Sequence, residues 1–193
     1  RVAAELRRWK VEIDDSAGTP LAETPPGAFL RLIANAGGER FAPVSLLSAL
    51  KHPLAAGGDD PARFRRRVRA LELSVLHGPR PGSGFDGLLE ALSQSDAPED
   101  VRRDLHTWID GLKDLIGGFA EISARADVPI ASLLDAHMIA AERLATTAGE
   151  PGTSRLWQGE EGEALASFVA ETHRALRDMP PIDGRSYPAL FDE

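Results

Sequence analysis

The sequence predicts a mainly α-helical fold, in which a small N-terminal part with one short strand and short helices precedes a helical bundle. Apolar residues recur at spacings of three and four over most of the chain, and segments rich in Gly and Pro separate these stretches. The hydrophobic fraction of 42% is enough to build a core, while no apolar run approaches the length that crosses a bilayer. We therefore expect a globular helical protein without membrane spans.

The first predicted element is a strand. Val11, Glu12 and Ile13 alternate as strand residues do, and turn-forming residues follow over residues 14–18. Asp14 and Asp15 come directly after this strand, where metal ligands sometimes lie. Neighbouring strand residues point to opposite faces, so a turn-stabilising role is the favoured interpretation of the pair.

Two short helices complete the N-terminal part, residues 1–56. Thr24 is expected to cap a helix that has Pro25 in its first turn and ends at Gly37 and Gly38. The second begins at Pro43 and ends near residues 52–53, because a proline disfavours helical geometry in the residue before it. The side chains expected to be buried are Phe29, Leu30, Leu32 and Ile33 in the first helix, and Val44, Leu47 and Leu50 in the second.

The helical bundle is expected over residues 57–185, after a hinge at residues 56–60. Its first helix begins at Asp60 and Pro61, and four apolar residues line one of its faces: Phe64, Val68, Leu71 and Val75. After a break at residues 78–84, a short helix is predicted over residues 85–95.

The longest predicted helix opens near Asp96 and Pro98 and carries a strict heptad seam. The seam consists of Val101, Leu105, Trp108, Leu112, Leu115, Phe119 and Ile122. Gly117 and Gly118 mark the expected position of a kink. The seam fits either the central helix of an intramolecular bundle or a dimerising coiled coil; the first is favoured, because further amphipathic segments need a surface to pack on.

Two more amphipathic helices are expected at residues 129–147 and 159–179, with Leu165, Phe168, Val169 and Leu176 as buried positions of the second. Residues 186–193 are expected to be the truncated start of a next helix, opened by Ser186. Because the chain also begins without Met, already in helical rhythm, we expect it to be an internal piece of a longer protein.

Composition excludes several chemistries. The chain has no Cys, which excludes disulfides and thiolate metal sites, and its five His are dispersed without a paired metal spacing, so no zinc site is expected. His137 is expected to be a packed or half-exposed helix residue. A P-loop needs Gly before its Lys, and a nuclease centre in which a carboxylate holds a metal beside a lysine needs an acidic residue two positions before that Lys. The three lysines, Lys10, Lys51 and Lys113, satisfy neither pattern.

The charge is distributed unevenly, with a net charge of −8. Residues 1–80 carry 13 Lys and Arg against 9 Asp and Glu, whereas the remainder carries 9 against 21. Any nucleic-acid contact is therefore expected within the first 80 residues. The acidic remainder is expected to face solvent or a basic partner.

One dense cluster of charge stands out, namely Arg63, Arg65, Arg66, Arg67 and Arg69. At about 100° per residue these arginines lie opposite the apolar stripe of their helix. The bland interpretation is a solvated face, partly neutralised by Asp59, Asp60 and Glu72. The functional interpretation is contact with DNA phosphates, which adds affinity without sequence specificity.

Several longer segments carry a family resemblance. They are EIDDSAGTPLAETPPGAFLRLI at 12–33, LLSALKHPLAAGG at 46–58, RFRRRVRALEL at 63–73, LHGPRPGSGFDGL at 76–88 and SRLWQGEEGEALASF at 154–168. In these segments the chain resembles AddB, the helicase-like subunit of the bacterial AddAB machine for double-strand-break repair, in its alphaproteobacterial form.

The resemblance implies that residues 1–56 belong to the second RecA-like helicase domain and most of the remainder to a helical insertion. It also implies a non-catalytic region in a cytoplasmic machine that unwinds and resects DNA ends with ATP and magnesium, together with an AddA-like partner subunit. No cofactor is expected within these residues. The alternative from another class is an independent helical protein-interaction module without a DNA role.

Overall fold

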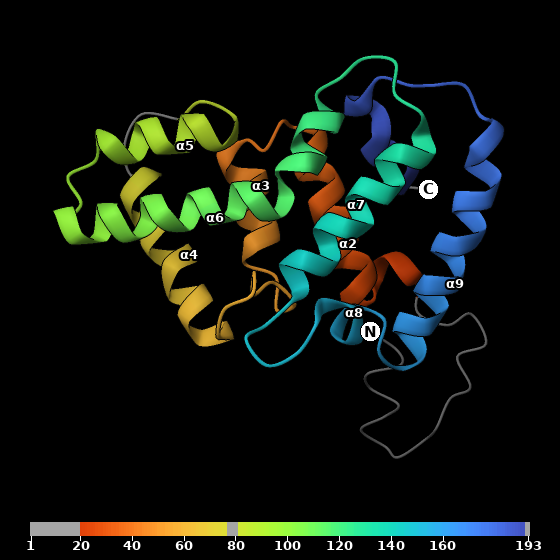
Figure 1. Ribbon diagram of the computed structural model, residues 1–193, viewed down its shortest axis with the longest axis horizontal. Coiled ribbons are helices and arrows are strands. Elements are labelled where there is room, and N and C mark those ends of the chain that lie inside the picture. The colour runs from red at the N-terminus through yellow and green to blue at the C-terminus, as the bar shows by residue number, and fades with distance from the viewer. Residues whose placement is uncertain (1–19, 77–80, 192–193) are drawn as a thin grey trace, which may run out of the picture.

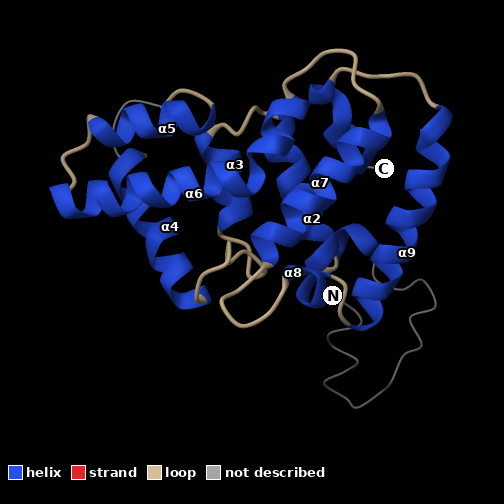
Figure 2. Ribbon diagram, in the orientation of Figure 1, coloured by secondary structure: helices blue, strands red, loops and turns tan. Residues whose placement is uncertain are grey.

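The computed structural model describes residues 20–76 and 81–191, and these residues form helices and connecting loops (Figures 1 and 2). The helices are η1 (Leu21–Glu23), α2 (Pro25–Gly38), α3 (Pro43–Leu50), α4 (Pro61–Val75), α5 (Gly84–Ser93), α6 (Glu99–Ser123), α7 (Ile130–Ala145), α8 (Gly152–Leu156), α9 (Gly159–Ala175), η2 (Leu176–Asp178) and η3 (Gly184–Phe191). The mainly α-helical fold is confirmed.

The described residues contain no strand, and their β pairing is limited to an isolated antiparallel bridge between Val128 and Ile182. The strand predicted at residues 11–13 lies outside the described residues, as do Asp14 and Asp15, so the structure gives that strand no support. None of the described helices is long and apolar enough to cross a membrane.

The helices pack in two groups that share α6 (Figure 1). On one side α6 packs against α4 and α5, and on the other it packs against α7, α2 and η3. Helix α2 also contacts α3, α7 and α9, which places it inside the second group. One continuous hydrophobic core takes residues from both sides of residue 56, so a division into 1–56 and 57–185 rests on sequence alone.

Local signals at the start of α2 determine where this helix begins. The Thr24 hydroxyl oxygen accepts a hydrogen bond from the Gly27 amide at 3.3 Å and donates to the Leu21 carbonyl at 2.7 Å. Pro25 costs nothing in the first turn, because amides there have no partner within the helix. The helix ends at Gly38 as predicted, and Phe29 is buried while Leu32 is only partly buried.

Helix α3 presents a different face from the predicted one. Leu47 and Leu50 are buried as expected, but Val44 is 61% exposed, and Leu46 takes the inner position. A helix of eight residues offers too few turns for its period to identify the buried side, which neighbouring helices decide.

The segment at residues 56–60, predicted as a hinge, is bound to the end of α7. The Ala56 and Gly57 amides both donate to the Leu144 carbonyl at 2.8 Å, and the Gly58 amide donates to the Thr146 carbonyl at 2.7 Å. Gly57 and Gly58 have positive φ angles of 54° and 83°, which glycine adopts without the strain that a side chain brings. The segment therefore separates two helices while fixing their relative positions.

Helix α6 runs through Gly117 and Gly118 without a break, and its ribbon bends toward its C-terminal end in Figure 1. Its fully buried positions depart from the predicted seam. Ile109, Ile116 and Ser123 are buried, whereas the predicted Val101, Leu115 and Ile122 are only partly buried. An α-helix has 3.6 residues per turn, so a strict heptad seam drifts by about 20° every seven residues. The seam nevertheless packs within the chain, which supports the intramolecular interpretation.

The last elements fold back onto the body of the molecule. α8 was not predicted, because five residues carry no measurable period. In α9, Leu165 is buried, but Phe168, predicted as buried, is 45% exposed. The segment predicted as the start of a next helix at Ser186 is instead a 3₁₀ helix, η3, which begins at Gly184 and packs on α2, α6 and α7.

Candidate functional site

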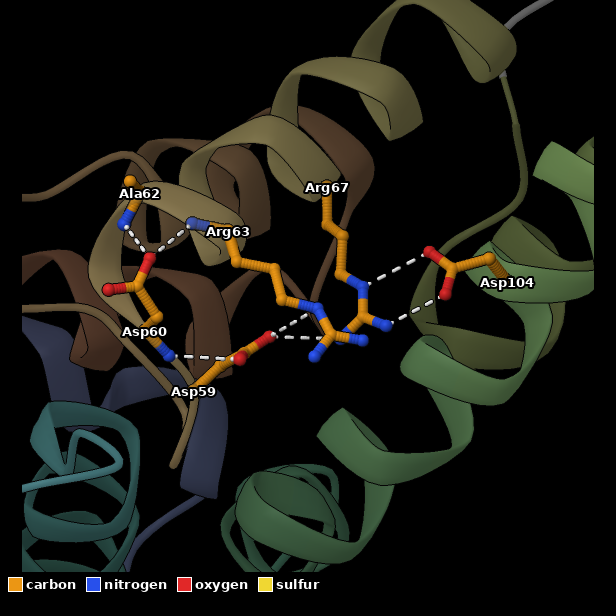
Figure 3. Close-up of polar contacts among 6 residues, drawn as sticks. All are labelled: Asp59, Asp60, Ala62, Arg63, Arg67 and Asp104. Carbon is orange, nitrogen blue, oxygen red and sulfur yellow. Dashed lines mark hydrogen bonds and ion pairs between the residues drawn. The ribbon is translucent and has the colours of Figure 1, made fainter.

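Helix α4 carries the arginine cluster, and its ends and core face fix its orientation. The Asp60 carboxylate caps the helix by accepting hydrogen bonds from the Ala62 amide at 3.0 Å and the Arg63 amide at 2.9 Å (Figure 3). The predicted apolar stripe is confirmed, since each of its four side chains is at most 3% exposed: Phe64, Val68, Leu71 and Val75. The arginines consequently lie on the sides and the outer surface of α4.

Arg67 is committed to structural ion pairs. Its guanidinium binds the Asp104 carboxylate of α6 with two hydrogen bonds, Nε to Oδ2 at 3.1 Å and Nη2 to Oδ1 at 2.7 Å (Figure 3). Nη1 also donates to Asp59 Oδ2 at 2.9 Å. The hydrogen bond with Asp104 raises the pKa of Arg67, and the same bond lowers the pKa of Asp104. We call this arrangement of Asp59, Arg67 and Asp104 the Arg67 clip; it joins α4 to α6.

The remaining arginines differ in their freedom. Arg63 is exposed, and its Nε lies 3.6 Å from Asp59 Oδ2, a weak pairing with a carboxylate that Arg67 already uses. Arg65, Arg66 and Arg69 are exposed and make no hydrogen bond or ion pair with any residue that the structure describes. The five-residue cluster therefore separates into a structural residue, a partly paired residue and three unpaired ones.

The neutralising carboxylates also divide their roles. Asp59 contributes to the clip as expected, whereas Asp60 serves as the cap of α4. Glu72 pairs with Lys51 of the segment after α3, at 2.5 Å. Asp104 was missed by sequence reasoning because it lies 37 residues from Arg67, on a helix whose packing the chain order does not reveal.

A groove of about 870 Å³ lies beside the arginines, between α4, α5 and the start of α6. Its lining includes the apolar Leu73 and Val101 and the acidic Glu90 and Asp96, with no aromatic side chain among the described lining residues. Bases stack on aromatic rings, and carboxylates repel phosphates, so the groove does not suit nucleic acid. Among the described residues, the exposed arginines on the outer surface of α4 suit phosphate contact better than this groove does.

No group of three His, Cys, Asp or Glu side chains among residues 20–76 and 81–191 is placed to hold a metal ion. His106 pairs with Asp110 at 3.1 Å and His173 with Asp135 at 3.0 Å. His52 is partly buried, and burial lowers its pKa. His137 differs from these residues because it is fully buried. Of the two possibilities that the sequence left open, a packed or a half-exposed helix residue, the structure shows the packed one.

Two of the three tryptophans of the chain lie within the described residues. Trp108 packs its ring edge to face with Phe64 at 5.4 Å, and Trp157 donates from Nε1 to Glu142 Oε1 at 2.8 Å. Trp9 lies outside the described residues.

Comparison with models of known families, with characterised proteins and with solved structures found no match.

Proposed function

We propose that this chain is a non-catalytic helical region of an AddB-like subunit, and that the outer face of α4 contacts DNA phosphates in the machine that processes double-strand breaks. The observation that carries the DNA contact is the set of unpaired, exposed arginines Arg65, Arg66 and Arg69 on one fixed helix. The family part of the proposal is supported by the sequence segments that resemble AddB.

The arginine face suits phosphate binding in a physical sense. Residues three and four apart on a helix have Cβ atoms about 5–6 Å apart, so Arg65 and Arg66 each neighbour Arg69. The Arg67 clip holds the backbone beneath them, which lowers the entropic cost of presenting several cations together. The described residues that line the groove beside this face include no aromatic side chain, so binding is expected to be independent of DNA sequence.

ATP, magnesium and the AddA-like subunit enter this proposal only through the family resemblance. The three lysines fit neither the P-loop nor the family's nuclease motif, so these residues are assigned no part in hydrolysis or strand cleavage. Their role in the proposal is to shape the DNA path and to contact the partner subunit.

A second candidate is the protein-interaction module without a DNA role. The observation that favours it is an exposed apolar surface where α9 meets η3. Phe168 is 45% exposed and Leu190 is 44% exposed, and both line a shallow apolar depression together with Val169 and Phe191. Apolar surface of this kind commonly marks contacts with other proteins.

Fluorescence anisotropy with a labelled DNA oligonucleotide at low ionic strength tests the DNA contact. We expect weak binding that is insensitive to sequence and falls steeply with salt, with a log–log slope of about −2 to −3 for three phosphates. The triple variant Arg65→Glu, Arg66→Glu, Arg69→Glu is expected to abolish binding without unfolding α4, because the buried stripe of this helix is untouched.

A matched control variant separates the effect of the α4 face on DNA binding from the effect of net charge. Arg125, Arg143 and Arg177 are also exposed, belong to parts of the chain other than α4, and change the net charge by the same amount when all three are replaced by Glu. This control variant is expected to bind DNA measurably at low ionic strength. Equal loss of DNA binding in both variants, or no DNA binding by the parent chain, would contradict the proposed DNA contact. The α4 face would then be an ordinary solvent-exposed helix face.

A further inference from the structure

His137 lies at the centre of a buried aromatic cluster. Its ring is 0% exposed, stacks on Phe119 with centroids 5.0 Å apart, and meets the edges of Tyr187 at 5.6 Å and Phe191 at 5.3 Å. These partners come from α6 and η3, whereas His137 belongs to α7. The imidazole is therefore the part of α7 on which η3 rests.

The ring has one good hydrogen bond. Nδ1 lies 3.0 Å from the Tyr187 hydroxyl oxygen, while Nε2 is buried and makes no hydrogen bond of normal geometry. The backbone carbonyl of Leu30 on α2 is the polar group that acts on the imidazole besides Tyr187. A carbonyl only accepts hydrogen bonds, so the neutral ring is best placed with its hydrogen on Nε2, and Nδ1 then accepts from the Tyr187 hydroxyl.

A second proton on His137 would remove this arrangement. Nδ1 would become a donor, and the Tyr187 hydroxyl hydrogen would lose the acceptor that it has in this arrangement. The positive charge would also lie buried among aromatic rings, a costly location for an unpaired charge. Burial accordingly lowers the pKa of His137 to about 3, with the Leu30 carbonyl opposing this only partly.

Within residues 20–76 and 81–191, no charged group acts on His137 to compensate a proton there. The groups that face it are the Leu30 carbonyl from α2, Phe119 from α6, and Tyr187 and Phe191 from η3. On α7 itself, Asp135 acts on Tyr187 but is paired with His173 of α9, and neither contributes to the ionisation of His137.

η3 supplies two of the aromatic side chains that pack on the His137 ring. Tyr187 is 1% exposed, and the side chain of Phe191 packs on the same imidazole. Just before η3, backbone hydrogen bonds join Val128 and Ile182 in both directions, and at its first residue the Gly184 amide donates to the Arg125 carbonyl. Within the described part of the chain no ion pair links η3 to another helix, since Arg185 pairs with the adjacent Asp183.

We propose that His137 and Tyr187 form an acid-sensitive latch, which holds η3 on α2, α6 and α7 while the imidazole is neutral and releases η3 when the imidazole takes up a proton. In the released state the imidazole reaches water and its pKa returns toward the ordinary value of about 6.5. Protons therefore bind the released state more tightly, and the latch weakens as pH falls below about 6.5, down to about 3.

Hydrogen exchange of the η3 amides, residues 184–191, measures the latch directly. Between pH 7 and pH 5 the opening equilibrium, corrected for intrinsic exchange rates, is expected to rise about 25-fold. Amides in the middle of α6 and α7 are expected to change far less. Tyr187 is the only Tyr in the chain, so ¹³C-tyrosine labelling gives a single NMR signal that must shift together with the His137 ring signal.

Two variants identify the titrating group. His137→Phe keeps an aromatic ring on Phe119 but cannot be protonated, and it is expected to abolish the pH dependence of η3 exchange. His173→Gln removes the other imidazole on this side of the molecule, and it is expected to leave the 25-fold rise in place.

Other results would overturn the latch. One is an opening equilibrium that rises equally in all helices between pH 7 and pH 5. Another is the same rise for η3 in His137→Phe. A third is a Tyr187 signal that shifts at a different pH from the His137 signal. The last measurement uses the parent chain alone, so it decides the matter even if His137→Phe does not fold.

Discussion

At the scale of single residues, neighbouring positions on α4 have unlike roles despite identical chemistry. Arg66 and Arg67 are adjacent in the sequence, yet Arg66 is exposed and has no partner in the described part of the chain, while the Arg67 side chain is only 19% exposed and binds two carboxylates. The difference of about 100° around the helix decides which guanidinium meets α6. The role of an arginine thus follows from what faces it.

Replacement of Arg67 by Ala is expected to lower the free energy of unfolding by about 1–2 kcal/mol. The variant removes a bidentate ion pair and leaves Asp59 without its main partner, although the exposure of Asp104 limits the loss. Urea unfolding followed by circular dichroism measures the change. Arg66→Ala is the matched control and is expected to stay within about 0.5 kcal/mol of the parent; equal effects of the two variants would contradict the clip.

The sequence predicted part of this site. It placed the arginines opposite the stripe of Phe64 and Val68, and it named Asp59 as a neutralising group, because both follow from spacing within one segment. It could not single out Arg67, because Asp104 comes from another helix. It also left the burial of His137 open, since an imidazole beside an apolar stripe packs or points outward depending on the segment that covers it.

At the scale of elements, helix ends were predicted better than helix faces. The caps Thr24 and Asp60 act over three residues, so their signals are local and complete. The buried faces of α3 and α9 depend on which helix covers them. The prediction that Val44 and Phe168 are buried was therefore wrong. The short α8 and the 3₁₀ geometry of η3 arise from tertiary contacts that leave no periodic pattern.

Gly117 and Gly118 lie inside α6, where glycine lowers helix stability. A Cβ atom added at Gly118 would meet nothing within 4 Å, and one at Gly117 would meet Lys113 Cγ at 3.7 Å, an ordinary contact. Each replacement by Ala is therefore expected to raise the free energy of unfolding by about 0.5–1 kcal/mol. Thermal unfolding of the single variants measures this gain.

Gly27→Ala provides the opposite case in α2. A Cβ atom there would lie 1.8 Å from the Leu21 carbonyl oxygen, so the variant is expected to destabilise the protein. If Gly118→Ala lowered the melting temperature as Gly27→Ala does, the bend of α6 would require glycine, contrary to our expectation.

At the scale of the whole molecule, α6 links the two groups of helices through one core. Trp108 is 9% exposed and packs on Phe64 of α4. Trp108→Ala is expected to lower the free energy of unfolding by about 3–5 kcal/mol, because the cavity cannot fully collapse. The melting temperature should fall equally at every protein concentration. A loss seen only in dilute solution would instead identify a dimer interface, and Val44→Ala, at an exposed site, is the control.

The Arg67 clip has a mechanical consequence. With 25 residues, α6 is about 37 Å long. The Arg67 clip attaches one end of α6 to α4, and the other end packs against α7. A force applied to the arginine face of α4 would therefore be transmitted through Asp104 to α6 rather than to a connecting loop. Asp104→Asn would weaken this connection, while the buried packing of Phe64 on Trp108 would still hold α4 on α6.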